Sequence, residues 1–169
     1  AGLPEPRLEQ DFSALELLES ERFAAVLDAA NNLANSWGAV PAGRVRAISL
    51  STCFDSIVST VVEVSKVTSS TGVVSIKVNR VAVALDCGGV VVNPNAVEAQ
   101  LQGGVSYALS AALWDQITFT SGKSDQTNFS KYRMVKGKEM PVVSTQTFAS
   151  GESPDIREPI QSDTNAPDS

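Results

Sequence analysis

Hydrophobic positions in the first part of the chain recur with the period of an α-helix. Ser13, followed by Glu16 three positions later, forms a capping-box pattern of the kind that begins a helix. Gly38 is suited to end it, because glycine readily adopts the left-handed conformation of a helix C-cap. Between them one apolar face is formed by Phe23, Val26, Leu27, Ala30, Leu33, Ala34 and Trp37. The pattern predicts a long helix that packs on a core by this face.

After Gly43 the period changes to that of β-strands. Residues 44–52 and 57–65 are rich in β-branched side chains, and apolar and polar residues alternate from Val74 to Asn79. The polar stretch 69–72 ends in glycine and predicts a turn, so the second and third strands are expected to form an antiparallel hairpin. The continuous apolar run 81–85 predicts that the third strand becomes buried on both faces near its end.

A second long helix is predicted from Asn93 to about Trp114. Asn93 is a good N-cap, and the proline that follows occupies the first helical position, where its missing N–H costs nothing. The apolar face comprises Val97, Leu101, Val105, Ala108 and Ala112. Gly103 and Gly104 interrupt this helix, and each costs about 1 kcal/mol relative to alanine. Close backbone packing against a neighbour would explain them.

The remaining pattern predicts a second hairpin and a final strand. Residues 117–120 and 127–131 flank the turn-like stretch 121–124, and residues 142–148 are strand-like. The expected fold is therefore α+β, with mostly antiparallel strands and two long helices. Residues 1–12 are interpreted as a lead-in, 13–150 as the domain, and 151–169 as an acidic tail with little to bury.

Composition fits one domain and excludes some partners. The 169 residues are 43% hydrophobic and carry a net charge of −6 with no basic cluster, so nucleic acid is not an expected partner. No apolar run is long enough for a membrane span, and the first residues lack the features of a signal peptide. Because the chain does not begin with Met, an export signal could have been removed. The compartment, bacterial periplasm or cytoplasm, stays open.

The cysteine and histidine content limits the chemistry. Cys53 and Cys87 lie in apolar surroundings, which favours two buried thiols over a disulfide, although the pairing stays open. The chain contains no histidine, which excludes Ser-His-Asp and Cys-His mechanisms and leaves a zinc site short of ligands.

A more specific signal lies where the third strand meets the second helix. The stretch from Asp86-Cys87-Gly88 to Asn93-Pro94 resembles the strand, glycine turn and long helix of the large subunits of molybdenum hydroxylases, the xanthine dehydrogenase and aldehyde oxidase family. The resemblance covers roughly residues 20 to 160 and is closest to the isoquinoline 1-oxidoreductase type. It continues through residues 97–104, 109–113, 128–133 and 139–141.

This resemblance implies part of a molybdenum-cofactor-binding domain. The implied reaction oxidises an aldehyde or N-heterocycle with water-derived oxygen, and electrons pass to an iron–sulfur subunit. Molybdopterin is implied in the complete enzyme, with none expected tightly bound to this chain alone, and the remaining part of the molybdenum-binding subunit is the implied partner. The alternative is a catalytically inactive, truncated relative that acts as a structural or interaction subunit.

Two site residues follow from the resemblance. Gln100 matches the glutamine that the family places near the cofactor, and its amide supplies both a donor and an acceptor. Glu158 matches the family's catalytic general base, although Asp155 and Arg157 replace the two glycines that precede it there. Without the resemblance, Gln100 is an exposed helix residue and Glu158 is one acid in an acidic tail.

Overall fold

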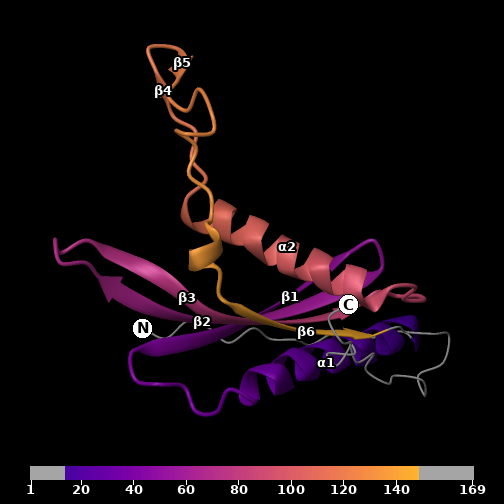
Figure 1. Ribbon diagram of the computed structural model, residues 1–169. Coiled ribbons are helices and arrows are strands. Elements are labelled where there is room, and N and C mark those ends of the chain that lie inside the picture. Colours follow the sequence, from indigo (N-terminus) through magenta and orange to yellow (C-terminus); the bar gives the residue numbers. More distant parts are fainter. Residues whose placement is uncertain (1–13, 149–169) are drawn as a thin grey trace, which may run out of the picture.

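The computed structural model describes residues 14–148, with side chains described from residue 21 onward. The lead-in 1–12 and the tail 151–169 therefore lie outside the described residues. The elements, shown in Figure 1, are α1 (Ala14–Asn35), β1 (Arg44–Cys53), β2 (Ser56–Thr68), β3 (Val74–Asp86), α2 (Pro94–Leu113), β4 (Phe119–Thr120), β5 (Lys123–Ser124), a 3₁₀ turn η1 (Gly137–Glu139) and β6 (Val142–Phe148).

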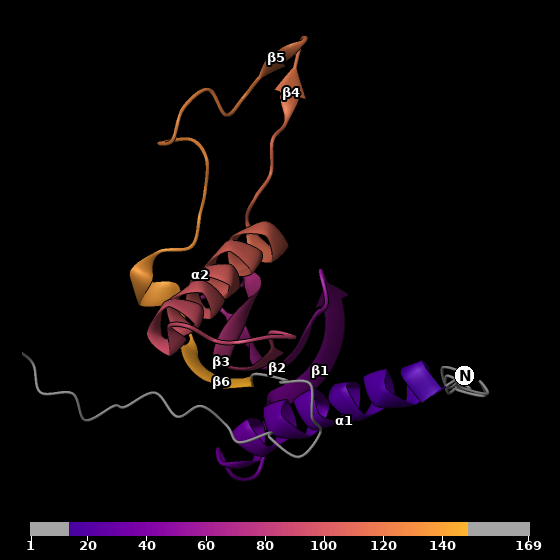
Figure 2. The same ribbon diagram turned by 90° about the vertical axis from the view of Figure 1, so that its right-hand side faces the viewer.

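A four-stranded sheet in the order β1-β2-β3-β6 forms the centre of the fold. Strands β1, β2 and β3 make an antiparallel meander, and β6 pairs in parallel with β3. The two helices lie on opposite faces of the sheet (Figures 1 and 2). The predicted α+β class with mostly antiparallel strands and two long helices is confirmed, and among the described residues the parallel β3–β6 pair is the one departure from antiparallel order.

Helix α1 covers one face of the sheet through the apolar side predicted from its periodicity. Val26, Ala30 and Ala34 are buried against β2 and β3, and Phe23, Leu33 and Trp37 pack around them. The small alanines let the helix approach the sheet closely. Gly38, with φ of +78°, lies in the left-handed region just after the helix, as its position predicted.

Strand β3 is buried on both faces from Val81 to Ala84, as its continuous apolar run predicted. A bulge interrupts the β2–β3 register, since Glu63 pairs with Arg80 whereas the next residue, Val64, pairs with Val78. One extra residue, Asn79, therefore lies on β3. Val78 and Val81 consequently both belong to the cluster under α2, and Arg80 lies on the α1 side, near Trp37.

Helix α2 covers the other face only in part. Its packed residues, Leu101, Val105, Leu109 and Leu113, rest on valines of β3 and on Val143 of β6. The neighbour expected at Gly103 and Gly104 is absent from the described chain: no atom lies within 4 Å of the position of a Cβ at either glycine, apart from the helix's own nearby backbone. The described residues therefore supply no such neighbour, and the expectation stays a prediction; Gly104 lines a groove between α2 and the sheet, whereas Gly103 does not.

An arm formed by residues 115–136 projects from the end of α2, with β4 and β5 near its tip (Figures 1 and 2). The predicted hairpin is shorter than expected, because Thr120 pairs with Lys123 and residues 127–131 form no strand. Side-chain hydrogen bonds take the place of the longer strand pairing that was predicted. The Asp125 carboxylate accepts hydrogen bonds from the hydroxyls of Thr118 and Thr120.

Candidate functional site

The junction of β3 and α2 is fixed by a buried carboxylate. Asp86 is 4% exposed and accepts a hydrogen bond from Arg22 Nε at 2.9 Å and another from the backbone N–H of Gly88 at 2.8 Å. Arg22 also donates to the backbone carbonyl of Asp55 at 2.9 Å. This network ties helix α1, the β1–β2 turn and the end of β3 together, so the loop that leads into α2 starts from a fixed point.

Gly88 is required by that arrangement. Its φ of +72° lies in the left-handed region, and a Cβ there would be 3.0 Å from the carbonyl oxygen of Asp55. At the other end of the loop Asn93 caps α2, with its side chain accepting from the backbone N–H of Ala96 at 3.1 Å. The N-cap and the proline at the start of α2 are therefore confirmed as predicted.

Gln100 is placed by this junction in the second turn of α2. Gln100 is exposed, and it lines a groove between α2 and the sheet. The groove has a volume of about 510 Å³. Apart from Gln100 and Thr60 its wall is apolar, formed by residues such as Val58, Val62, Val83, Leu101 and Val105.

Glu158 lies outside the described residues, as do Asp155 and Arg157. The structure therefore does not test whether Glu158 approaches Gln100, and both assignments remain predictions. Between residues 14 and 148 no group of three or more Asp, Glu, Cys or His side chains could hold a metal ion. Neither helix in that part of the chain is long and apolar enough to cross a bilayer.

The two cysteines differ in their environments. Both are free thiols; Cys53 is exposed at the end of β1, and Cys87 is half-buried. The prediction of two buried thiols was wrong for Cys53, because β1 is an edge strand and its last residue adjoins an open turn. Burial raises the pKa of the Cys87 thiol, and the adjacent Asp86 carboxylate raises it further.

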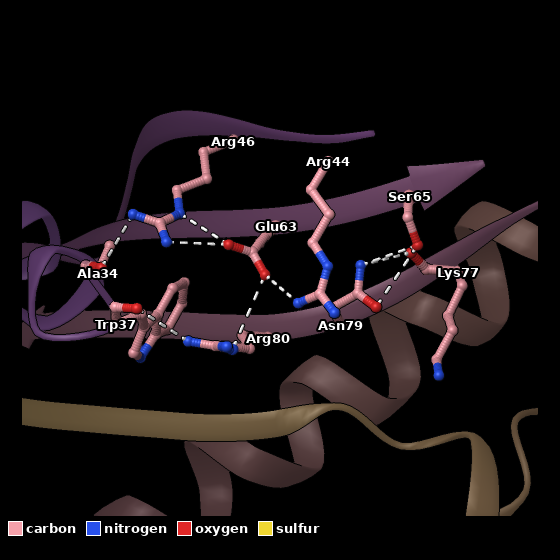
Figure 3. A network of polar contacts seen from close by, with 9 residues as sticks. All are labelled: Ala34, Trp37, Arg44, Arg46, Glu63, Ser65, Lys77, Asn79 and Arg80. Carbon is pink, nitrogen blue, oxygen red and sulfur yellow. Dashed lines mark hydrogen bonds and ion pairs between the residues drawn. The ribbon is translucent and has the colours of Figure 1, made fainter. Parts of the chain in front are cut away.

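Sequence reasoning did not identify the polar cluster on the α1 face. Glu63 is completely buried in β2 and lies among three arginines (Figure 3). Its carboxylate contacts Arg44 at 2.8 Å, Arg46 at 2.9 Å and Arg80 at 3.8 Å. These contacts, above all the hydrogen bond from Arg44, hold the pKa of Glu63 below its ordinary value despite its burial. The available signal was a glutamate flanked by apolar residues in one strand, with arginines on both neighbouring strands.

The same arginines close the C-terminal end of α1. Arg46 donates to the Ala34 carbonyl at 3.2 Å and Arg80 to the Trp37 carbonyl at 3.4 Å. The two guanidinium groups lie 5.3 and 5.7 Å from the centre of the Trp37 ring (Figure 3). Because these charged groups pair with one another and with the carbonyls at the helix end, this cluster is a structural support for the sheet.

The residues around Gln100 can be compared with what the cofactor implied by the resemblance requires. A pterin cofactor presents many polar atoms, and a complete site needs matching donors and acceptors. The groove wall offers the Gln100 amide at its rim and an otherwise apolar lining. The described residues thus fit a contact to the polar edge of a cofactor at Gln100, and they do not form an enclosure for the whole group.

The fold is a mostly antiparallel sheet with a helix on each face, and its third strand leads through a fixed glycine turn into a long helix. Residues 43–141, from the start of β1 to the start of β6, match the family of molybdopterin cofactor-binding domains. The chain belongs to this family. The resemblance to molybdenum hydroxylases found in the sequence is thereby confirmed for their molybdopterin-binding domain.

Among curated proteins, the isoquinoline 1-oxidoreductase subunit beta of Brevundimonas diminuta is 33% identical to this chain over 69 residues. The match covers 41% of this chain but spans only 9% of the relative's length.

Solved structures show a similar fold. A Cu,Mo-CO dehydrogenase matches with a TM-score of 0.50 at 20% identity, over 56% of this chain and 12% of that one. Quinoline 2-oxidoreductase from Pseudomonas putida 86 matches with a TM-score of 0.46 at 23% identity, over 59% of this chain and 12% of that one. At this identity the likeness to the CO dehydrogenase concerns the fold alone.

Proposed function

We propose that this chain forms part of the molybdopterin-binding domain of a molybdenum hydroxylase that oxidises an N-heterocycle or an aldehyde with water-derived oxygen. The observation that carries the proposal is the β3–α2 junction, where Asp86, Gly88 and Asn93 fix the start of α2 and so the position of Gln100, within a match to the family of molybdopterin-binding domains. The named activity of the Brevundimonas relative favours the N-heterocycle.

Two residues carry the proposed chemistry. The Gln100 amide donates to and accepts from the polar edge of the cofactor and so orients it. When bound, the cofactor would supply the oxidation chemistry and the route for electrons to an iron–sulfur partner. Glu158 accepts, on a carboxylate oxygen, the proton released as water-derived oxygen is transferred to the substrate.

The proposed assembly includes the remaining part of the molybdenum-binding subunit. The support is that the groove at Gln100 is apolar along nearly all of its wall and that the match spans a small fraction of the relative's length. The other polar contacts of the cofactor then come from chain segments beyond this sequence.

Native mass spectrometry of the purified protein, with molybdenum and pterin analysis of the same sample, tests the proposal. The expected result is a complex that contains this chain, a larger molybdenum-binding chain and stoichiometric cofactor. A chain that remains alone and free of metal in material from its natural host contradicts the proposal.

A catalytically inactive structural subunit is the second candidate, and the charged residues before Glu158 favour it. Asp155 and Arg157 stand where the family has glycines, and Arg157 beside Glu158 would weaken that carboxylate as a base. Replacing Glu158 with Gln in the assembled complex separates the two, with Glu152→Gln in the same tail as the control. A large loss of turnover in the Glu158 variant alone supports catalysis, whereas unchanged turnover supports the structural role.

A further inference from the structure

The apolar groove beside α2 lies over a sheet face that α2 covers only in part. Four strands spaced about 4.8 Å apart make a sheet about 14 Å wide between its outer strands, and packed helices lie about 8–10 Å apart. Such a face has room for two helices. Helix α2 packs over β6 and the adjoining part of β3, so the space over β1 and β2 is open on this face.

The surface exposed in that space is apolar beside Val62 and Val64 of β2, and it becomes polar farther along, where Ser49 and Ser51 of β1 lie opposite Thr60 and Val58. Val58, Val62 and Val64 of β2 line the groove. Their partners on β1 include Val45, which is 63% exposed, and Ala47, which is also exposed. An apolar surface that extends from a groove onto the neighbouring strand is typical of a buried interface.

The wall of the groove formed by α2 has the shape that a second helix requires. Gly104, Ala108 and Ala112 recur at four-residue intervals, are exposed and line the groove, with Gln100 one turn before them. No atom lies within 4 Å of the position of a Cβ at Gly104 outside the helix's own nearby backbone. Such a row of small residues lets the ridges of another helix approach the backbone of α2 closely.

Neither end of this sequence suits the space. Segments 1–13 and 149–169 contain few apolar residues, and each is interrupted by prolines that oppose a continuous helix. These prolines are Pro4 and Pro6 in the first segment and Pro154, Pro159 and Pro167 in the second. Neither segment therefore encodes a long apolar helical face that would fill the space.

We infer that an amphipathic α-helix from the remainder of the molybdenum-binding subunit docks in this groove, against β1 and β2 and along the Gly104–Ala108–Ala112 row of α2. The inference rests on the proposed function, because it takes the helix from the part of the subunit that the match to the relative leaves uncovered. The docked helix covers the apolar part of this face. It also closes the groove at Gln100 and shields that side chain from water.

The glycine pair of α2 provides a matched test. Gly103 and Gly104 are adjacent, exposed and equally uncrowded, but Gly104 lines the groove and Gly103 does not. Leucine at either position improves helix propensity to the same degree, so both variants should fold, which circular dichroism checks. Leucine at 104 fills the space needed by the incoming helix, whereas leucine at 103 leaves that space open.

The tagged chain and both variants are expressed in the natural host, and captured proteins are identified and quantified by peptide mass spectrometry. We expect the molybdenum-binding subunit to be recovered with the wild type and with Gly103→Leu. With Gly104→Leu its recovered amount should fall by a factor of about ten or more. Equal recovery with both variants overturns the docking site while leaving the proposed function intact.

Two other outcomes contradict the inference in distinguishable ways. Recovery of no molybdenum-binding subunit with any version contradicts the proposed function and the docking site together. A homodimer of this chain that is lost in Gly104→Leu assigns the groove to a second copy instead.

Discussion

Arg46 and Glu63 face each other directly across the β1–β2 pair, with Arg46 Nε and Nη2 each 2.9 Å from Glu63 Oε2. Every residue of β1 is exposed or half-buried, so this edge strand has little apolar burial to hold it in place. Besides the backbone pairing with β2, the Arg46 and Arg44 contacts to Glu63 therefore help to fix β1 to the sheet.

Replacing Glu63 with Gln should lower the free energy of unfolding by about 3–5 kcal/mol, because it removes one partner of a buried ion-pair cluster and leaves the arginines uncompensated. Urea titration followed by tryptophan fluorescence measures the change. Asp28→Asn on the exposed side of α1 is the control and should alter stability by no more than about 0.5 kcal/mol. Equal losses in the two variants would show that Glu63 has no special role.

Stability should fall in acid because two glutamates have lowered pKa values. Hydrogen bonds from Arg133 and from the Lys136 backbone lower the pKa of Glu139 from 4.5 to about 2, and Arg44 lowers that of Glu63. The unfolded chain binds protons more readily, so the stabilisation is complete above pH 4.5 and is lost as the pH falls toward about 2. Across this pH range the midpoint of unfolding should vary less steeply with pH in Glu139→Gln than in the wild type. An unchanged slope in that variant would argue against the Arg133–Glu139 pair as a cause.

Gly88→Ala should destabilise the β3–α2 junction. The left-handed backbone costs a non-glycine residue about 1–2 kcal/mol, and the added Cβ would press on the Asp55 carbonyl at 3.0 Å. The free energy of unfolding should therefore drop by at least that amount. Gly89→Ala is the matched control, since no atom lies within 4 Å of its Cβ position. Similar values for both variants would remove the argument that Gly88 is required by its conformation.

The two thiols should react at different rates with an aromatic disulfide reagent. Cys53 is exposed, whereas burial and the Asp86 carboxylate raise the pKa of Cys87 and so lower its thiolate fraction. We expect a fast phase that disappears in Cys53→Ser and a slow phase that disappears in Cys87→Ser. A single fast phase for both thiols would contradict the described burial of Cys87.

The elements with strong local signals were predictable from the sequence. Helix α1 followed from its apolar period and Gly38, and helix α2 from Asn93 and the proline after it. Both are set by residues close together in the chain. The β2–β3 hairpin followed similarly from a short polar turn between two alternating segments.

Features that depend on distant residues were not predictable in the same way. The buried position of Glu63 depends on arginines from β1 and β3, and a single strand pattern does not report its neighbours. The open side of α2 was also hidden, because Ala108 and Ala112 fit an apolar helix face whether or not anything covers them. The roles of Gln100 and Glu158 both came from the family resemblance, and both stay predictions.

The parallel pairing of β6 with β3 has a consequence for the order of folding. Strands β1 to β3 pair with their immediate neighbours in sequence, whereas β6 reaches β3 only after α2 and the arm have been traversed. Forming that pair closes a long loop, and the entropy of closure delays it relative to the meander. During synthesis the three-stranded meander can thus form against α1 first. Until β6 arrives, the outer edge of β3 is open to pairing with another chain, which makes this interval the period of greatest aggregation risk.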